Sequence, residues 1–372
     1  MAIDATLDAL IIDLTINLTP PPAAPVGFGE VLLLVDEAAG NPLPGGVRSI
    51  RFTSVGEAST AQAAGEITAA VLQGITDAFT PLAGQSRVPT AVQVGRVDTA
   101  ALESYPDALA LVLAGGANVW AVCADTRVAA DQVALDAAIA SAANRMIGFW
   151  QSSDVAWKIP AGGIPAAYTG IDSGRSLVVW HDTDAEWADL VWATNRLAFD
   201  PDVISVVWNT PLPAVLAYAT GITTAERDAI IGNGANVVLP YYSATSYVFP
   251  GESVNASGAG FTGNELLTRD WFEQRAFEYI AAEQIKLATR GEKIPVTIEG
   301  QGIVLGALAW VVETSQTAGH IVKGQIAIRG DAIDAADLAG LQLSFTGEGQ
   351  IENSAKKLIV GLSFGRQAVV TS

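Results

Sequence analysis

A histidine next to a turn of acidic residues is the first candidate for catalytic chemistry. His181 is followed by Asp182 and Asp184 at the end of an apolar run, residues 176–180. An α/β enzyme holds its catalytic groups at such strand ends. The second histidine, His320, lies far away in the sequence. Aspartates that cap the next helix explain the same pattern without catalysis, and we favour this capping explanation.

A glycine-rich motif, Gly-Ala-Gly-Phe-Thr-Gly at residues 258–263, matches the dinucleotide-binding fingerprint. A cofactor loop of this kind must follow a buried strand, so that the helix N-terminus meets the pyrophosphate. Residues 252–257 are polar and predict a loop instead. Ser173 lies in a Gly-Ile-Asp-Ser-Gly stretch that lacks the strand and helix of a serine-hydrolase turn.

Metal-ligating residues do not cluster along the sequence either. The chain has one cysteine and two histidines, and its carboxylates are scattered. Cys123 lies in an apolar run, which predicts a core residue, and a single cysteine excludes an intrachain disulfide. We therefore predict no catalytic site, no metal site and no cofactor. An α/β enzyme remains an alternative.

The composition indicates extensive apolar burial and an acidic surface. Of the 372 residues, 50% are hydrophobic and 16% are charged, and the mean hydropathy is +0.34. The net charge of −19 argues against nucleic-acid binding, which requires a basic stripe. The longest apolar stretches, residues 109–123 and 303–312, are shorter than the ~20 residues that a bilayer demands. We therefore expect no membrane insertion, and the apolar excess must be buried within the chain or against partners.

Short apolar strands alternate with amphipathic helices through most of the chain, which predicts a layered α/β core with largely parallel pairing. The expected strands are residues 30–35, 48–52, 91–94, 119–123, 176–180, 203–208, 236–239, 324–328, 341–346 and 357–364, and residues 147–150 are expected as strand or loop. Three helices are expected at residues 60–79, 269–290 and 303–314. Two more begin near Asp125 or Thr126 and near Asp184, and a sixth begins with a Thr-Thr-Ala-Glu capping box at 223–226.

Amphipathic strands are also expected at both ends of the chain. At the N-terminus, apolar residues alternate with polar ones, and a run of prolines at 20–22 follows as a stiff spacer. At the C-terminus two strands alternate in the same way. The alternating apolar residues are Ile12, Leu14, Ile16 and Leu18 at one end, and Leu341, Leu343, Phe345, Leu358, Val360, Leu362 and Phe364 at the other.

The first strand requires a sheet on which to dock. Burial of its four aliphatic side chains yields roughly 6–12 kcal/mol. Ordering of the backbone costs about 1–2 kcal/mol per residue, so the balance over the strand is near zero. The sheet can belong to the same chain or, because of the spacer, to another copy. The C-terminal strands provide a plausible docking sheet, and we expect exchange between subunits.

The order of these motifs resembles that of the contractile tail sheath proteins of myovirus-type bacteriophages. The resemblance begins with the strand, the proline spacer and Gly-Phe-Gly-Glu-Val-Leu-Leu-Leu at 27–34, and ends with Lys-Ile-Pro-Val-Thr-Ile-Glu-Gly-Gln-Gly-Ile at 293–303. Between them lie Val-Gln-Val-Gly-Arg at 92–96, the strand and helix of 121–145 with Thr-Arg-Val-Ala-Ala-Asp, the strand and helix of 176–198, and residues 223–237 and 251–258.

The resemblance implies a structural virion protein. Six copies would form a ring, and rings would stack helically around a tail tube. The terminal arms would donate strands to neighbouring subunits, and the sheath would shorten to drive the tube through the host envelope. The implied partners are other copies, the tail tube protein, and the baseplate and tail terminator proteins. The implied location is the contractile tail of the virion, after assembly in the host cytoplasm. A different tail, baseplate or adhesin protein is the alternative.

The same resemblance implies four parts of the chain. Residues 1–26 would form the N-terminal strand arm and spacer. Residues 27–260 would form the α/β sheath part, with room for an inserted outer subdomain around 90–240. Residues 261–340 would form a helical and strand part that faces the tube, and residues 341–372 would form the C-terminal strand arm.

Overall fold

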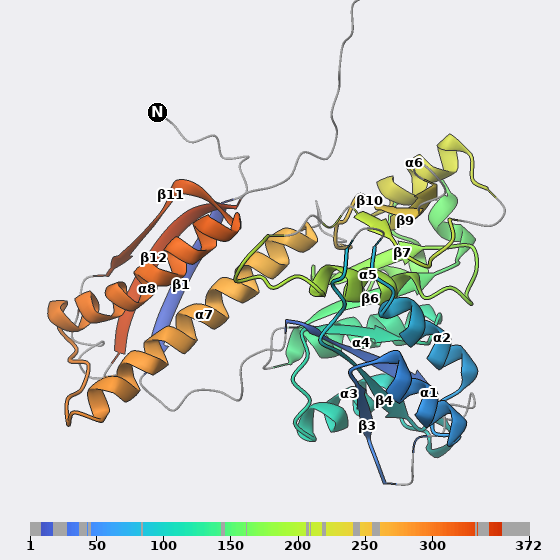
Figure 1. Ribbon diagram of the computed structural model, residues 1–372. Helices are drawn as coiled ribbons and strands as arrows, with labels where there is room; N and C mark the ends of the chain where they lie inside the picture. The colour runs from blue at the N-terminus through green and yellow to red at the C-terminus, as the bar shows by residue number, and fades with distance from the viewer. Residues whose placement is uncertain are drawn as a thin grey trace, which may run out of the picture.

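The structure is a computed structural model with two units. It describes residues 9–17, 28–36, 43, 46–82, 85–142, 146–160, 162–205, 208, 210–217, 221–240, 246–254, 261–331, 333 and 342–351. The larger unit is a nine-stranded sheet with helices on both faces. The smaller unit combines a three-stranded sheet with long helices (Figure 1). The α/β class predicted from the sequence is therefore confirmed.

The large sheet has a parallel centre and antiparallel sides. Its strands are β2 (Glu30–Asp36), β3 (Ser49–Phe52), β4 (Ala91–Val97), β5 (Ala121–Ala124), β6 (Ile147–Ser152), β7 (Ser176–Trp180), β8 (Thr210–Leu212), β9 (Asn236–Pro240) and β10 (Ser246–Phe249). They lie in the order β3-β4-β2-β5-β6-β7-β9-β10-β8. The pairs from β4 to β9 are parallel, and β3, β10 and β8 pair antiparallel. The strands of residues 90–240 thus continue the same sheet as β2 and β3.

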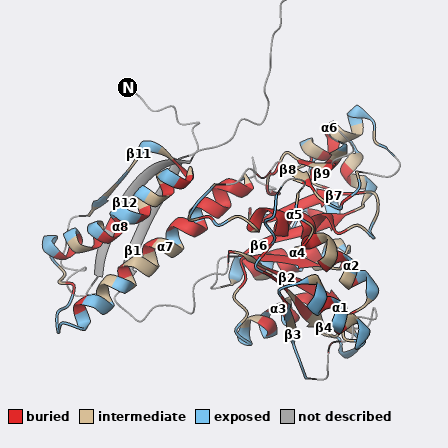
Figure 2. Cartoon of the chain, viewed as in Figure 1, coloured by how far each residue is buried: buried red, intermediate tan, exposed pale blue. Residues whose placement is uncertain are grey.

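Helices cover both faces of this sheet, so its central strands are buried on both sides. They are α1 (Val55–Ala63), α2 (Ala69–Ala78), α3 (Tyr105–Ala114), α4 (Ala129–Ser141), α5 (Ala188–Leu197) and α6 (Thr224–Gly232), with short 3₁₀ turns at Thr99–Ala101, Val155–Lys158 and Ala166–Tyr168. On β2, Leu33 packs in the core with α1, α2 and α5, while Leu32 packs in a second core with α3, α4 and α6. Figure 2 shows these strands and α5 as buried. Continuous apolar strands such as Ser176–Trp180 are typical of this arrangement.

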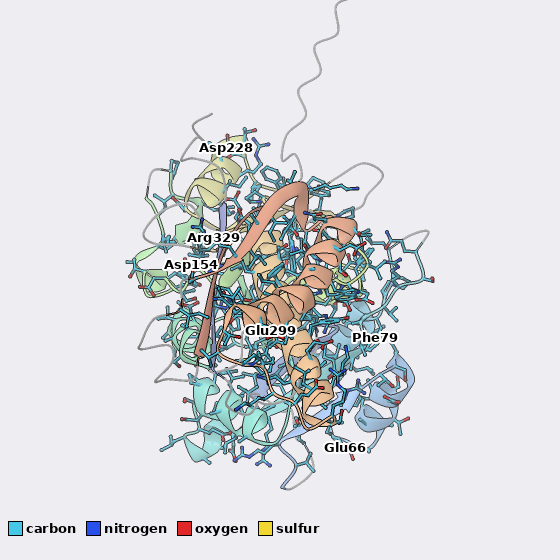
Figure 3. The ribbon with its side chains drawn as sticks, turned by 90° about the vertical axis from the view of Figure 1, so that its left-hand side faces the viewer. Glu66, Phe79, Asp154, Asp228, Glu299 and Arg329 are labelled. Atoms are coloured by element: carbon cyan, nitrogen blue, oxygen red, sulfur yellow. The ribbon has the colours of Figure 1, made fainter. Side chains whose placement is uncertain are left out.

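The smaller unit contains β1 (Ala9–Asn17), α7 (Gly263–Ala288), α8 (Ile298–Ala318), β11 (Ile321–Gly330) and β12 (Gln342–Ile351). The first half of α7 is buried against the large sheet, where Asp270 accepts a hydrogen bond from Trp120 Nε1 at 2.8 Å and pairs with Arg175. The second half packs against α8. Figure 3 is viewed from the side of this unit, with Arg329 of β11 and Glu299 of α8 labelled. The helix α7 therefore joins the two units.

Several sequence-based element predictions are wrong in detail. The helix expected at 60–79 is two helices, α1 and α2, because Gly65 interrupts it with a φ of +77°. In the described part of residues 203–208 there is no strand, and β8 follows instead. The strand β10 is absent from the strands predicted from the sequence, and α8 is longer than residues 303–314. The cap of α4 is Val128 without a side-chain bond, so neither Asp125 nor Thr126 caps it.

Candidate assembly sheet

The three-stranded sheet brings the two ends of the chain together. Its order is β1-β12-β11, and both pairs are antiparallel. All nine residues of β1 pair with β12 in a regular register that sets Ile12 opposite Gly347, Leu14 opposite Phe345, and Ile16 opposite Leu343. In this structure the first strand therefore docks on the C-terminal strand of its own chain.

One face of this sheet is apolar, and the burial of individual residues identifies it. Phe345 is 0% exposed and belongs to the core cluster that contains Leu308 of α8. On β11, Ile326 and Ile328 are half-buried, whereas the next residue, Arg329, is exposed. Partners across an antiparallel ladder share a face. Phe345 thus packs toward the helices, and the register sets Leu14 opposite it, with Ile12, Ile16 and Leu343 two residues further along the same ladder.

The edges of the two sheets differ in how they resist further pairing. At one edge of the large sheet, Arg51 on β3 is paired with Glu30, and at the other, β8 contains Pro211. Edge charges and prolines discourage strand addition. In the small sheet, β11 has a register shift between Ile321 and Ile326, while the ladder between β1 and β12 is continuous. The small sheet is therefore the better candidate for strand exchange.

Five of the predicted exchange residues lie together in this sheet. Leu14 is opposite Phe345 and Ile16 is opposite Leu343, while Ile12 is opposite Gly347 in the same ladder. The others lie outside the described residues: Leu18, Leu341, Leu358, Val360, Leu362 and Phe364. Sequence reasoning predicted the strand at 324–328, but it did not identify that strand as the third member of this sheet. The alternation of Ile326 and Ile328 with Ala327 and Arg329 was the signal that the sequence offered for this amphipathic strand.

The residues first considered for catalysis are explained by packing. His181 is 1% exposed, its Nε2 lies 2.9 Å from the carbonyl oxygen of Leu216, and its Nδ1 accepts a hydrogen bond from the backbone N–H of Thr183. The N-cap of α5 is Trp187, so the predicted capping role of Asp184 is wrong. Ser173 donates its hydroxyl hydrogen to the buried Asp136.

The glycine-rich motif and Cys123 were the other candidates for chemistry. Within the glycine-rich motif, residues 258–260 lie outside the described residues, and Gly263 begins α7 after the antiparallel strand β10. Burial raises the pKa of the Cys123 thiol well above its usual range, and the residue is 0% exposed. Among the described residues, no group of three or more histidine, cysteine or carboxylate side chains could hold a metal ion. None of the described helices is both long and apolar enough to cross a bilayer.

No protein-family model and no curated protein matches this sequence. Solved structures do match it. The chain is similar to a chain of the anti-feeding prophage helical sheath in the contracted state, with 12% identity, a TM-score of 0.62, and coverage of 95% of this chain and 98% of that chain. The chain has the fold of contractile sheath proteins.

Two further structures agree with this fold. The chain is similar to a chain of the PVC sheath complex, an extracellular contractile injection system in the contracted state, with 11% identity, a TM-score of 0.61 and coverage of 93% of both chains. It is also similar to the sheath tail protein of Listeria innocua, with 9% identity, a TM-score of 0.52, and coverage of 89% of this chain and 97% of that chain. The resemblance to sheath proteins predicted from the sequence is thus confirmed for the fold.

Phe345 should dominate the stability of the small sheet in this sheath fold. Its side chain is fully buried, so Phe345→Ala is expected to destabilise the small unit by about 3–5 kcal/mol. Hydrogen exchange of the β11 and β12 amides would measure the loss. Ala327→Ser, at an exposed position of β11, is the matched control and should leave the exchange unchanged. Equal exchange in both variants would contradict the assigned face.

Proposed function

We propose that this chain is the structural subunit of a contractile sheath. It polymerises as hexameric rings that stack around a tail tube, and it drives the tube by shortening from an extended to a contracted lattice. The observation that carries this proposal is the match over 95% of the chain to a chain of a helical sheath. No nucleotide is consumed, and the free energy comes from a rearrangement between two packings of rigid subunits.

Strand exchange between subunits is part of this proposal. The ladder between β1 and β12 involves only nine residues at the end of the chain. Residues 18–29 follow β1 before β2 begins, and such a length of chain spans at most about 40 Å. The position beside β12 can therefore be filled by β1 of the same chain or by β1 of a neighbour, with identical hydrogen bonds. In the polymer we expect the neighbour, since such β-augmentation links subunits while they move.

The partners follow from the same proposal. The smaller unit faces the tail tube, and its helix α8 exposes apolar surface: Ile298 is 83% exposed and Trp310 is 41% exposed. The ring of Trp310 stacks on Tyr279 of α7 at 4.1 Å, which keeps this aromatic surface in place. The baseplate and the tail terminator would bind the two ends of the polymer. The particle is a virion tail or a related injection system.

A pair of engineered cysteines tests both polymerisation and exchange. Thr15 and Ser344 are opposite partners in the β1–β12 ladder, and the Cα atoms of such partners are close enough for a disulfide. The single native cysteine, Cys123, is buried and does not interfere. We expect oxidation of the polymer formed by the Thr15→Cys, Ser344→Cys chain to give covalent ladders on a non-reducing gel, and hollow striated cylinders in the electron microscope.

The single variant Thr15→Cys is the control, since it cannot link a series of subunits. Cross-linked monomers without ladders would show that β1 pairs only within its own chain. A particle of fixed low order in place of cylinders would favour the second candidate, a baseplate component. That candidate has a specific basis, because the chain also matches a chain of the anti-feeding prophage baseplate structure, with a TM-score of 0.63 and 11% identity.

A further inference from the structure

Besides the continuous helix α7, a loop of the larger unit also connects the two units. Residues 200–205, between α5 and β8, reach both α7 and the corner at which α8 turns into β11. We call this contact the joint. Its members are Pro201, Asp202 and Ser205 on the larger unit, and Thr268, Trp271, Arg275, Ala318 and His320 on the other side.

Hydrogen bonds connect the loop side of the joint with α7 and with α8. The carboxylate of Asp202 accepts hydrogen bonds from Trp271 Nε1 at 2.6 Å and from Arg275 Nε and Nη2 at 2.8 and 2.9 Å. The backbone N–H of Ser205 donates to the carbonyl oxygen of Ala318 at 2.7 Å. These hydrogen bonds connect the loop of residues 200–205 with α7 and with the end of α8.

His320 lies at the centre of the joint, and both of its ring nitrogens are engaged in hydrogen bonds. Its Nε2 lies 2.6 Å from the carbonyl oxygen of Pro201, which can only accept, so Nε2 carries the hydrogen. In the neutral ring Nδ1 is then the acceptor, and it lies 3.1 Å from the hydroxyl of Thr268. The side chain is 0% exposed, and its ring stacks on Trp271 at a centroid distance of 4.8 Å.

We propose that the joint is acid-labile, because protonation of His320 opens the contact between the two units. A proton on Nδ1 would bring a second N–H against the Thr268 hydroxyl, which would have to stop donating, and it would place a positive charge on a fully buried side chain. When the joint opens, the ring reaches solvent and can hold its proton. Mild acid would therefore free the smaller unit to pivot on α7.

Burial sets the sign of this effect, and the groups around the ring oppose it, among them the hydrogen bond to the Pro201 carbonyl. Asp202, on the loop, and the stacked Trp271, on α7, favour the protonated ring, but Asp202 is already engaged by Arg275. From α8, the nearest contact is the Ser315 carbonyl, which is uncharged and accepts from the His320 backbone N–H. Burial outweighs these attractions and lowers the pKa of His320. The closed joint thus binds its proton less readily than the open joint, so closure is weakened as the pH falls below about 6.5.

The backbone N–H of Ser205 reports directly on closure of the joint. Hydrogen exchange of the full, unassembled chain can be measured at pH 7.0 and 5.5 and corrected for the intrinsic exchange rate. We expect the protection of Ser205 to fall by about tenfold between these pH values, since one proton per opening changes the constant up to tenfold per pH unit. The amide of Leu33, in the middle of the large sheet, is the reference and should stay protected.

Two variants separate His320 from other causes. His320→Gln retains a donor for the Pro201 carbonyl but cannot ionise, so the protection of Ser205 should become independent of pH. His181→Gln is the matched control: His181 is also buried, but it lies within the larger unit, and this variant should behave as the wild type. If His320→Gln does not fold, the two histidine ring signals of the wild type can be followed by NMR, and one of them should titrate together with Ser205.

The proposal would be overturned by any of three results. Ser205 protection could be unchanged in the wild type at pH 5.5, or could fall equally in His320→Gln. Alternatively, Leu33 could lose protection in parallel, which would indicate unfolding of the whole chain. None of these results bears on polymerisation, so the inference can fail while the proposed sheath function stands.

Discussion

Replacement of Asp136 by alanine is expected to lower the free energy of unfolding of the larger unit by about 4 kcal/mol. The carboxylate is 1% exposed and accepts hydrogen bonds from the Ser173 and Ser176 hydroxyls at 2.5 and 2.6 Å, and from the backbone N–H groups of Asp172 and Ser173. A hydrogen bond to a charged group contributes about 1.5–3 kcal/mol, and buried donors left without an acceptor cost about 1–3 kcal/mol each. Chemical denaturation followed by circular dichroism measures the loss.

Asp131, on the same helix, provides the matched control. It is half-buried and accepts one side-chain hydrogen bond, from Thr126 Oγ1 at 2.8 Å. Asp131→Ala should cost about 1 kcal/mol. If the two variants unfold at the same denaturant concentration, Asp136 does not hold α4 against the turn that precedes β7. Asp136→Asn should fall between them, since it preserves the shape but loses one acceptor.

Deletion of residues 1–19 is expected to abolish polymerisation while leaving the larger unit folded. The deletion removes β1, whose nine residues pair only with β12 among the described strands. The large sheet receives no strand from this segment, so its core should be unaffected. Sedimentation would show a monomer in place of cylinders, and the far-ultraviolet circular dichroism of the helices should remain.

A shorter deletion separates the strand from the residues before it. Removal of residues 1–8 leaves β1 in place, so this variant should polymerise as the full chain does. Loss of the helical signal on deletion of 1–19 would show that β1 is needed by its own chain. Cylinders formed without β1 would show that strand exchange does not link the subunits.

The sequence by itself predicted those elements whose signals are local. The alternation of Ile12, Leu14 and Ile16 with polar residues predicted a strand, and β1 is a strand that pairs with β12. The capping box at Thr223 and Glu226 begins α6 as predicted, because a cap involves only residues three positions apart. The continuous apolar runs predicted the buried parallel strands, because a strand covered on both faces is apolar at every position.

Where the sequence reasoning failed, distant residues decided the outcome. The stretch at 203–208 is apolar enough for a strand, yet Ser205 bonds to Ala318 of the smaller unit instead. The strand β10 was not predicted, and its place between β9 and β8 depends on pairing with both of these neighbours. The helix at 60–79 is divided at Gly65, where a positive φ fits the packing of α1 on α2.

For the assembly sheet, the sequence determined which strands are amphipathic, and only the tertiary structure decided which of them pair. Strand periodicity depends on a residue and its second neighbour, so it can be read from the chain alone. The partnership of Leu14 with Phe345 joins residues at opposite ends of the chain. It depends on α7 and α8 holding β12 in place, because a nine-residue strand gains too little from its own burial to order by itself.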